Sequence, residues 1–92
     1  MDNLTLAQRL REHARQLDGN DGNLYRIRAY RRAAQILMGL ERPVTEILAE
    51  AGVKGLQDFP GIGAHLAFTI EHLARTGEFL TFDERPRTRI AS

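Results

Sequence analysis

Apolar residues recur at helical spacing from the beginning of the chain. Leu6, Leu10 and Leu17 are separated by four and seven residues, which places them on one face of a helix. We therefore predict a first helix over about residues 4–17, which Asn3 or Thr5 can cap. The following residues, 18–22, are turn formers without an apolar side chain, so they end this helix.

A second helix is predicted after Asn23, a good N-cap residue, and it reaches about Leu40 before Pro43 stops it. Its apolar stripe is expected to consist of Ile27, Ala34, Leu37 and Met38, with Tyr30 and Ala33 beside it. Its opposite face carries Arg28, Arg31, Arg32 and Gln35, which follow one another at positions i, i+3, i+4 and i+7. This helix is thus apolar on one side and cationic on the other.

The rest of the chain predicts shorter elements. A third helix covers 44–51 and ends at Gly52, one helical turn follows over 55–59, and a last helix covers 64–75 with Gly77 after its end. No strand pattern and no internal repeat is present. We predict an all-α fold, a compact bundle of four to five short helices, with residues 1–82 as a single domain and 83–92 as a flexible tail.

Composition narrows the possible chemistry. The 92 residues contain no cysteine, which excludes disulfides, a thiolate nucleophile and cysteine-bound zinc. No apolar run approaches the roughly 18 residues that a membrane-spanning helix needs, and no hydrophobic leader is visible, so we expect a cytoplasmic protein without a membrane partner. The formal net charge is +1, with Lys54 as the only lysine, so almost all cations are arginines.

A tight turn at residues 59–63, Phe-Pro-Gly-Ile-Gly, carries the most informative pattern. Pro60 cannot continue the preceding helix, while Gly61 and Gly63 permit positive φ and leave no Cβ between the backbone and a ligand. The next helix begins with backbone amides that can face an anion. The turn therefore predicts phosphate binding through the amides of Gly61, Gly63 and Ala64.

The turn resembles a helix-hairpin-helix motif, and the resemblance extends beyond it. Residues 23–34, Asn-Leu-Tyr-Arg-Ile-Arg-Ala-Tyr-Arg-Arg-Ala-Ala, are similar to the second-helix signature of the N-terminal, lyase-type domain of family X DNA polymerases. Thr76 and Gly77 stand where that domain carries a Thr-Gly pair. The resemblance covers about residues 4–82 and implies a four-helix domain that binds single-stranded or gapped DNA on its 5′-phosphate side.

The resemblance also implies roles for individual residues. Tyr25 matches a position that stacks on a template base, and Arg26 and Tyr30 match the pocket for the 5′-phosphate. Each tyrosine has an equally good structural explanation, as a helix staple for Tyr25 and as a half-buried packing residue for Tyr30. The backbone carbonyls that often hold a monovalent cation, Na⁺ or K⁺, next to a DNA phosphate match Gln57, Phe59 and Ile62.

Departures from the family pattern argue against an enzyme. Lyase chemistry needs a lysine amine that forms a Schiff base, but Thr69 stands at the nucleophile position, and His65 and Thr81 stand at supporting lysine positions. Lys54 lies before the hairpin. Nucleotidyl transfer needs paired carboxylates on a palm domain, and the chain has neither an Asp-x-Asp pair nor room for that domain.

We therefore predict a non-catalytic module that binds DNA without sequence preference, in DNA repair or processing. The residues expected at the interface are Gly61, Gly63, Ala64, His65, Arg26, Tyr30, Tyr25, Arg28 and Arg31. The arginine face could instead be solvated and paired with acids of the first or third helix.

The alternative function is that of a protein–protein adaptor. It is favoured by the near-neutral charge and by Glu46, Glu50 and Asp58 around the third helix. Phe68 lies off the apolar stripe of the last helix and, if exposed, would mark a site for a protein partner.

Overall fold

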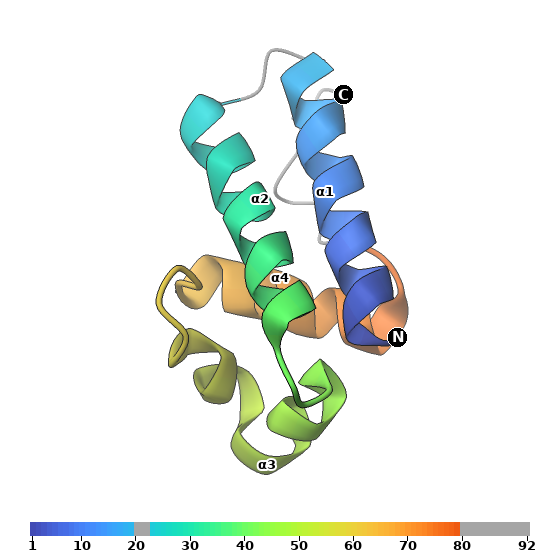
Figure 1. Ribbon diagram of the computed structural model, residues 1–92, viewed down its shortest axis with the longest axis vertical. Helices are drawn as coiled ribbons and strands as arrows, with labels where there is room; N and C mark the ends of the chain where they lie inside the picture. Colours follow the sequence, from blue (N-terminus) through green and yellow to red (C-terminus); the bar gives the residue numbers. More distant parts are fainter. Residues whose placement is uncertain (20–22, 80–92) are drawn as a thin grey trace, which may run out of the picture.

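Four α-helices make up the computed structural model, which describes residues 1–19 and 23–79 (Figure 1). They are α1 (Asn3–Gly19), α2 (Leu24–Gly39), α3 (Val44–Gln57) and α4 (Ala64–Thr76). The described residues contain no strand, so the predicted all-α bundle is confirmed. The predicted tail, 83–92, and Thr81 lie outside the described residues. None of the described helices is long and apolar enough to cross a membrane.

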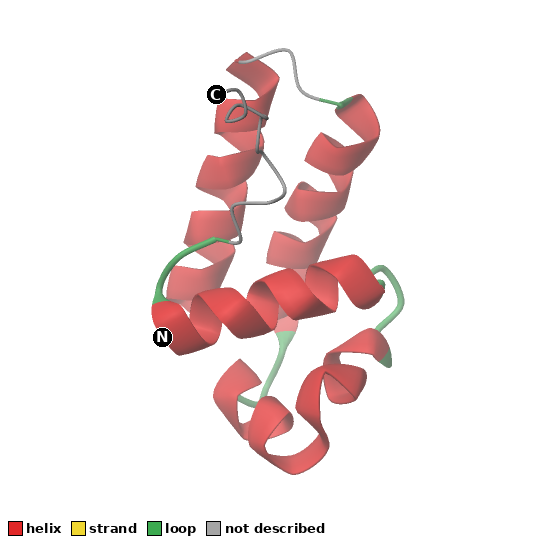
Figure 2. Ribbon diagram, turned by 180° about the vertical axis from the view of Figure 1, so that it is seen from behind, coloured by secondary structure: helices red, strands yellow, loops and turns green. Residues whose placement is uncertain are grey.

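The helices pack as two pairs. α1 and α2 run side by side in opposite directions, and α4 crosses near the N-terminal end of α1, as Figures 1 and 2 show from opposite sides. α3 packs mainly on α4. The core joins leucines and isoleucines from different helices, among them Leu10, Ile27 and Ile70, all of them buried. Burying each such side chain stabilises the fold by about 1.5–3 kcal/mol.

The start of α1 differs from the prediction. Asp2 caps the helix, because its Oδ1 accepts a hydrogen bond from the Thr5 amide at 2.8 Å. Hydrogen bonds from the Thr5 side chain and backbone also lower the pKa of the Asp2 carboxyl. The prediction that Asn3 or Thr5 caps α1 was therefore wrong.

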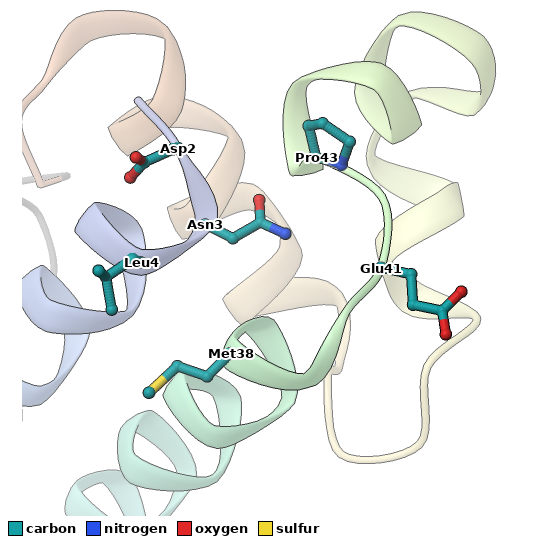
Figure 3. Close-up of a pocket in the computed structure, with 6 residues that line it drawn as sticks. All are labelled: Asp2, Asn3, Leu4, Met38, Glu41 and Pro43. Atoms are coloured by element: carbon teal, nitrogen blue, oxygen red, sulfur yellow. The ribbon is translucent and has the colours of Figure 1, made fainter.

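Asn3 instead joins α1 to the beginning of α3. Its Oδ1 accepts from the Val44 amide at 2.8 Å, and its Nδ2 donates to the Arg42 carbonyl at 2.8 Å. Figure 3 shows the Asn3 side chain between α1 and the segment that leads to Pro43. Because Pro43 gives α3 no side-chain cap, Asn3 supplies that acceptor from a distant part of the chain.

The N-terminus of α2 agrees with the prediction, but the buried face of the helix differs from the predicted apolar stripe. The Asn23 side chain accepts hydrogen bonds from the amides of Tyr25 at 2.7 Å and Arg26 at 3.2 Å, so the predicted cap is confirmed. Met38 is 50% exposed and therefore does not belong to the apolar stripe. Tyr30 is only 1% exposed, so it is a core residue and not half-buried.

Glycines set the ends of the later helices. Gly52 has φ 67° and ψ −163°, so it breaks α3 where the sequence predicts an end, and helical residues continue beyond it to Gln57. This second stretch begins and ends about two residues earlier than the turn predicted over 55–59. Gly77 has φ 81°, and its amide donates to the Leu73 carbonyl at 2.8 Å, which confirms the predicted end of α4.

Candidate nucleic-acid interface

A groove of about 840 Å³ lies between the N-terminal half of α2 and the hairpin, residues 58–63, that connects α3 to α4. We call it the hairpin groove. On the α2 side its lining includes Tyr25, Arg26, Arg28, Tyr30 and Arg32. On the hairpin and α4 side it includes Gln57, Phe59, Gly61, Ile62, Gly63, Ala64 and His65. The fold thus brings together two sequence motifs that are more than twenty residues apart.

The hairpin is held against α2 at Gly61. This residue has φ 101°, and a Cβ built on it would lie 2.8 Å from Cδ of Arg32 and 3.0 Å from Cδ1 of Ile36. Ile62 is buried, and its amide donates to the Phe59 carbonyl at 3.1 Å. Gly61 therefore needs to be glycine both for its conformation and for its contact with α2.

Gly63 behaves differently from Gly61. Its φ is −84°, so it does not use the positive φ that glycine permits, and a Cβ on it would meet no atom within 4 Å. The backbone there is extended and lies open to solvent. The absence of a side chain at Gly63 leaves the start of α4 accessible to a ligand.

The N-terminus of α4 presents unpaired amides to the groove. No side-chain hydrogen bond caps this helix, and the Ala67 amide donates to the Gly63 carbonyl at 2.9 Å. Among the described residues, the amides of Gly61, Gly63 and Ala64 donate to no acceptor. These three amides are the ones predicted to bind phosphate, and the helix dipole adds a partial positive charge at the same place.

The lining of the groove is cationic. Arg26, Arg28 and Arg32 come from α2 and His65 from α4, while the described lining residues include no Asp or Glu. Within the part of the chain that the structure describes, Arg28 and Arg32 form no ion pair. The alternative in which acids of neighbouring helices neutralise this face is therefore wrong for these two arginines, and their charge is available to an anion.

The two tyrosines occupy opposite environments. Tyr25 lies in the first turn of α2. It is 83% exposed and presents its ring to solvent beside the groove. Tyr30 is buried and lies at the bottom of the groove, where its ring packs edge-on against His13 at 4.9 Å between centroids. Tyr30 was predicted to be a half-buried packing residue, and it is buried almost completely. It therefore forms part of the floor of the groove.

The carbonyls predicted to hold a cation lie in the same hairpin. Among the described residues, the carbonyls of Gln57 and Ile62 accept no backbone hydrogen bond, whereas that of Phe59 accepts one from Ile62. A carbonyl oxygen has a second lone pair, so Phe59 also retains capacity. Oxygen donors without a hydrogen-bond partner fit a hard cation such as Na⁺ or K⁺. The described residues contain no group of three His, Cys, Asp or Glu side chains that could bind a metal ion.

Arg31 and Arg32 belong to the same predicted arginine face but line different pockets. Arg31 does not line the hairpin groove but a separate pocket, together with Arg11, Gln35 and Met38. Arg32 lies in the groove against Gly61. The helical spacing placed Arg32 on the same face as Arg28, and the structure brings both to the groove.

Thr69 is turned away from the groove. It is fully buried, and its hydroxyl donates to the His65 carbonyl at 3.0 Å. Lys54 is exposed on α3 and does not line the groove. The structure therefore brings neither of these residues to the candidate interface.

A further pocket, of about 370 Å³, lies between the start of α1 and the end of α2 (Figure 3). Its lining contains Asp2, Glu41, Leu4 and Met38, so it offers acids and apolar groups without a cation. Its chemistry is the opposite of what phosphate requires, which distinguishes it from the hairpin groove.

The helix-hairpin-helix domain family matches residues 1–79, a range that includes every residue that the structure describes. Comparison with curated proteins and with solved structures gave no match. The match includes both sides of the hairpin groove, and domains of this kind commonly bind DNA without sequence preference. The chain therefore belongs to the helix-hairpin-helix domain family.

Proposed function

We propose that this domain binds the sugar-phosphate backbone of DNA in the hairpin groove, without sequence preference and without catalysing a reaction. The observation that carries the proposal is the composition of the groove. Unpaired amides at the start of α4 face the same space as the arginines of α2, and none of the residues that the structure describes in the lining is an acid. Backbone amides and guanidinium groups are the usual donors to phosphate oxygens, and neither depends on the base.

The preferred ligand in this proposal is single-stranded or gapped DNA with a 5′-phosphate. A terminal phosphate monoester carries about 1.5–2 negative charges near neutral pH, more than a diester does, so a cationic groove favours strand ends. The exposed ring of Tyr25 lies at the rim of the groove, where an unpaired base can stack on it. Such a preference would place the domain in DNA repair or processing.

A monovalent cation completes the proposed interface. The carbonyls of Gln57, Phe59 and Ile62 would hold Na⁺ or K⁺, and the cation would attract a phosphate oxygen to the hairpin. The unpaired carbonyls of Gln57 and Ile62 support this assignment. Arg28, Arg32 and the amides of Gly63 and Ala64 would bind the remaining phosphate oxygens.

The absence of lyase chemistry is part of the proposal. A Schiff base needs an unprotonated amine in the groove, whereas the side chain that matches the nucleophile position is the buried hydroxyl of Thr69. We expect borohydride reduction in the presence of an abasic oligonucleotide to trap no covalent adduct. A trapped adduct would contradict this part of the proposal alone.

Fluorescence anisotropy at low salt tests DNA binding. We expect 5′-phosphorylated single-stranded or gapped oligonucleotides to bind more tightly than unphosphorylated ones and than blunt duplex. Arg28→Gln and Arg32→Gln should each weaken binding, and each should reduce the slope of log affinity against log salt by about 0.7 on single strands.

Arg15→Gln is the matched control for this experiment. Arg15 is exposed on α1, outside the hairpin groove, and the substitution changes the net charge by the same amount. It should therefore leave binding unchanged. Flat titrations with every DNA would refute the proposal and would favour the adaptor function, for which the 57% exposed Phe68 is the candidate contact.

A further inference from the structure

A second cationic pocket lies between α1 and α2. It has a volume of about 300 Å³, and it is formed by Arg11 of α1 with Arg31, Gln35 and Met38 of α2. We call it the α1–α2 pocket. Its lining, as far as the structure describes it, contains two arginines and one glutamine and no Asp or Glu.

The two arginines of this pocket are not neutralised within the described residues. Arg11 donates from Nη1 to Sδ of Met38 at 3.7 Å, and a thioether is a weak acceptor without charge. The neighbouring Glu12 pairs with Arg15 at 2.6 Å and not with Arg11. Arg31 forms no ion pair in the described part of the chain. The two positive charges beside this pocket repel each other, and an anion bound between them would offset that repulsion.

The α1–α2 pocket and the hairpin groove are adjacent on the surface of α2. Arg28 lines the groove and Arg31 lines the pocket, and residues three apart on a helix have Cβ atoms about 5–6 Å from each other. Groups that can bind an anion therefore line a path from the start of α4, across α2, to Arg11 on α1. This path is longer than one phosphate and follows the exposed face of two packed helices.

We propose that Arg11, Arg31 and Gln35 form a second phosphate-binding site, which holds a DNA strand after it leaves the hairpin groove. This inference rests on the proposed function, because the groove anchors the strand. A lone phosphate gains little from two exposed arginines in water, but a phosphate tethered to a strand already in the groove is present at high effective concentration. Guanidinium groups hold two of its oxygens, and the Gln35 amide donates to a diester oxygen.

The test compares strands of two lengths. One is a short 5′-phosphorylated oligonucleotide that fills only the hairpin groove, and the other is the same sequence extended at its 3′ end. We expect the double variant R11Q/R31Q to weaken binding of the extended strand by about tenfold. The salt slope for that strand should fall by about 0.7 for each arginine removed. Binding of the short strand should not change.

Arg15→Gln again serves as the matched control, since Arg15 lies one turn from Arg11 on α1 and outside the pocket. If R11Q/R31Q affects the extended strand no more than this control does, or weakens both strands equally, the second site is refuted. Arg28→Gln separates the two proposals. If it weakens binding while R11Q/R31Q does not, only the second site fails, and if neither has an effect, the proposed function fails as well.

Discussion

At the scale of single residues, position on a helix decides function more than residue type does. Arg31 and Arg32 are neighbours of the same type, yet Arg32 lies against Gly61 in the hairpin groove and Arg31 lies beside Arg11. Successive residues of an α-helix point about 100° apart, since one turn takes about 3.6 residues. Adjacent residues of α2 therefore lie on different surfaces of the helix.

The two hairpin glycines allow a direct test at this scale. Gly61→Ala should destabilise the domain by about 1–3 kcal/mol, because its φ of 101° strains any residue with a Cβ, and the new methyl group also presses on Arg32 and Ile36. Gly63→Ala should change the free energy of unfolding by less than about 0.5 kcal/mol, since its φ is negative and its surroundings are open. Urea unfolding followed by circular dichroism measures both, and equal effects would contradict the assignment.

At the scale of elements, three aromatic rings tie the segment after α4 to the first two helices. His13 of α1 stacks on Phe79 with 4.3 Å between centroids, and Tyr30 of α2 meets both rings edge-on. Arg9 adds a cation–π contact with Phe79 at 5.7 Å and donates to the Gly77 carbonyl at 3.0 Å. His13, which is only 8% exposed, is therefore a packing residue, and the cluster supports the floor of the groove at Tyr30.

Substitutions of two phenylalanines test the importance of the aromatic cluster formed by His13, Tyr30 and Phe79. Phe79→Ala should lower the free energy of unfolding by about 1–2 kcal/mol, because it removes the aromatic and cation–π contacts. Phe68→Ala should change it by less than about 0.5 kcal/mol, because Phe68 is 57% exposed. Chemical unfolding of both variants against the wild type gives the comparison. A loss at Phe68 as large as at Phe79 would show that Phe68 is buried against a partner, for example in an oligomer.

At the scale of the whole molecule, one side chain connects the two helix pairs. Asn3 accepts from the first amide of α3 and donates to the Arg42 carbonyl, across about forty residues of sequence. α3 has no side-chain cap of its own, so its N-terminus depends on α1 being in place. This link helps to position α3, and with it the hairpin, relative to α1 and α2.

Two substitutions at Asn3 test this link. Asn3→Ala should cost about 2 kcal/mol of stability, because it removes two hydrogen bonds and leaves a part-buried amide at Val44 without an acceptor. Asn3→Asp keeps the acceptor for Val44 and loses the donor to Arg42, so its loss should be roughly half as large. Urea unfolding measures both. If Asn3→Asp were as damaging as Asn3→Ala, the bond to Val44 would not be the important one.

The helices and the motif that identifies the hairpin were predictable from local patterns of residues. Apolar spacing, the cap at Asn23 and the glycines at 52 and 77 are local signals, and each acts within one or two helical turns. The amides of Gly61, Gly63 and Ala64 were predictable for the same reason, because they follow from the backbone of one turn.

The packing of the helices determines which side chains share a surface. The burial of Tyr30, the stacking of His13 on Phe79 and the capping of α3 by Asn3 all depend on residues far away in the sequence. The division of the arginines between the hairpin groove and the α1–α2 pocket depends on how α2 is rotated against its neighbours. Helical periodicity defines a face but not its partner, and packing between helices supplies that partner.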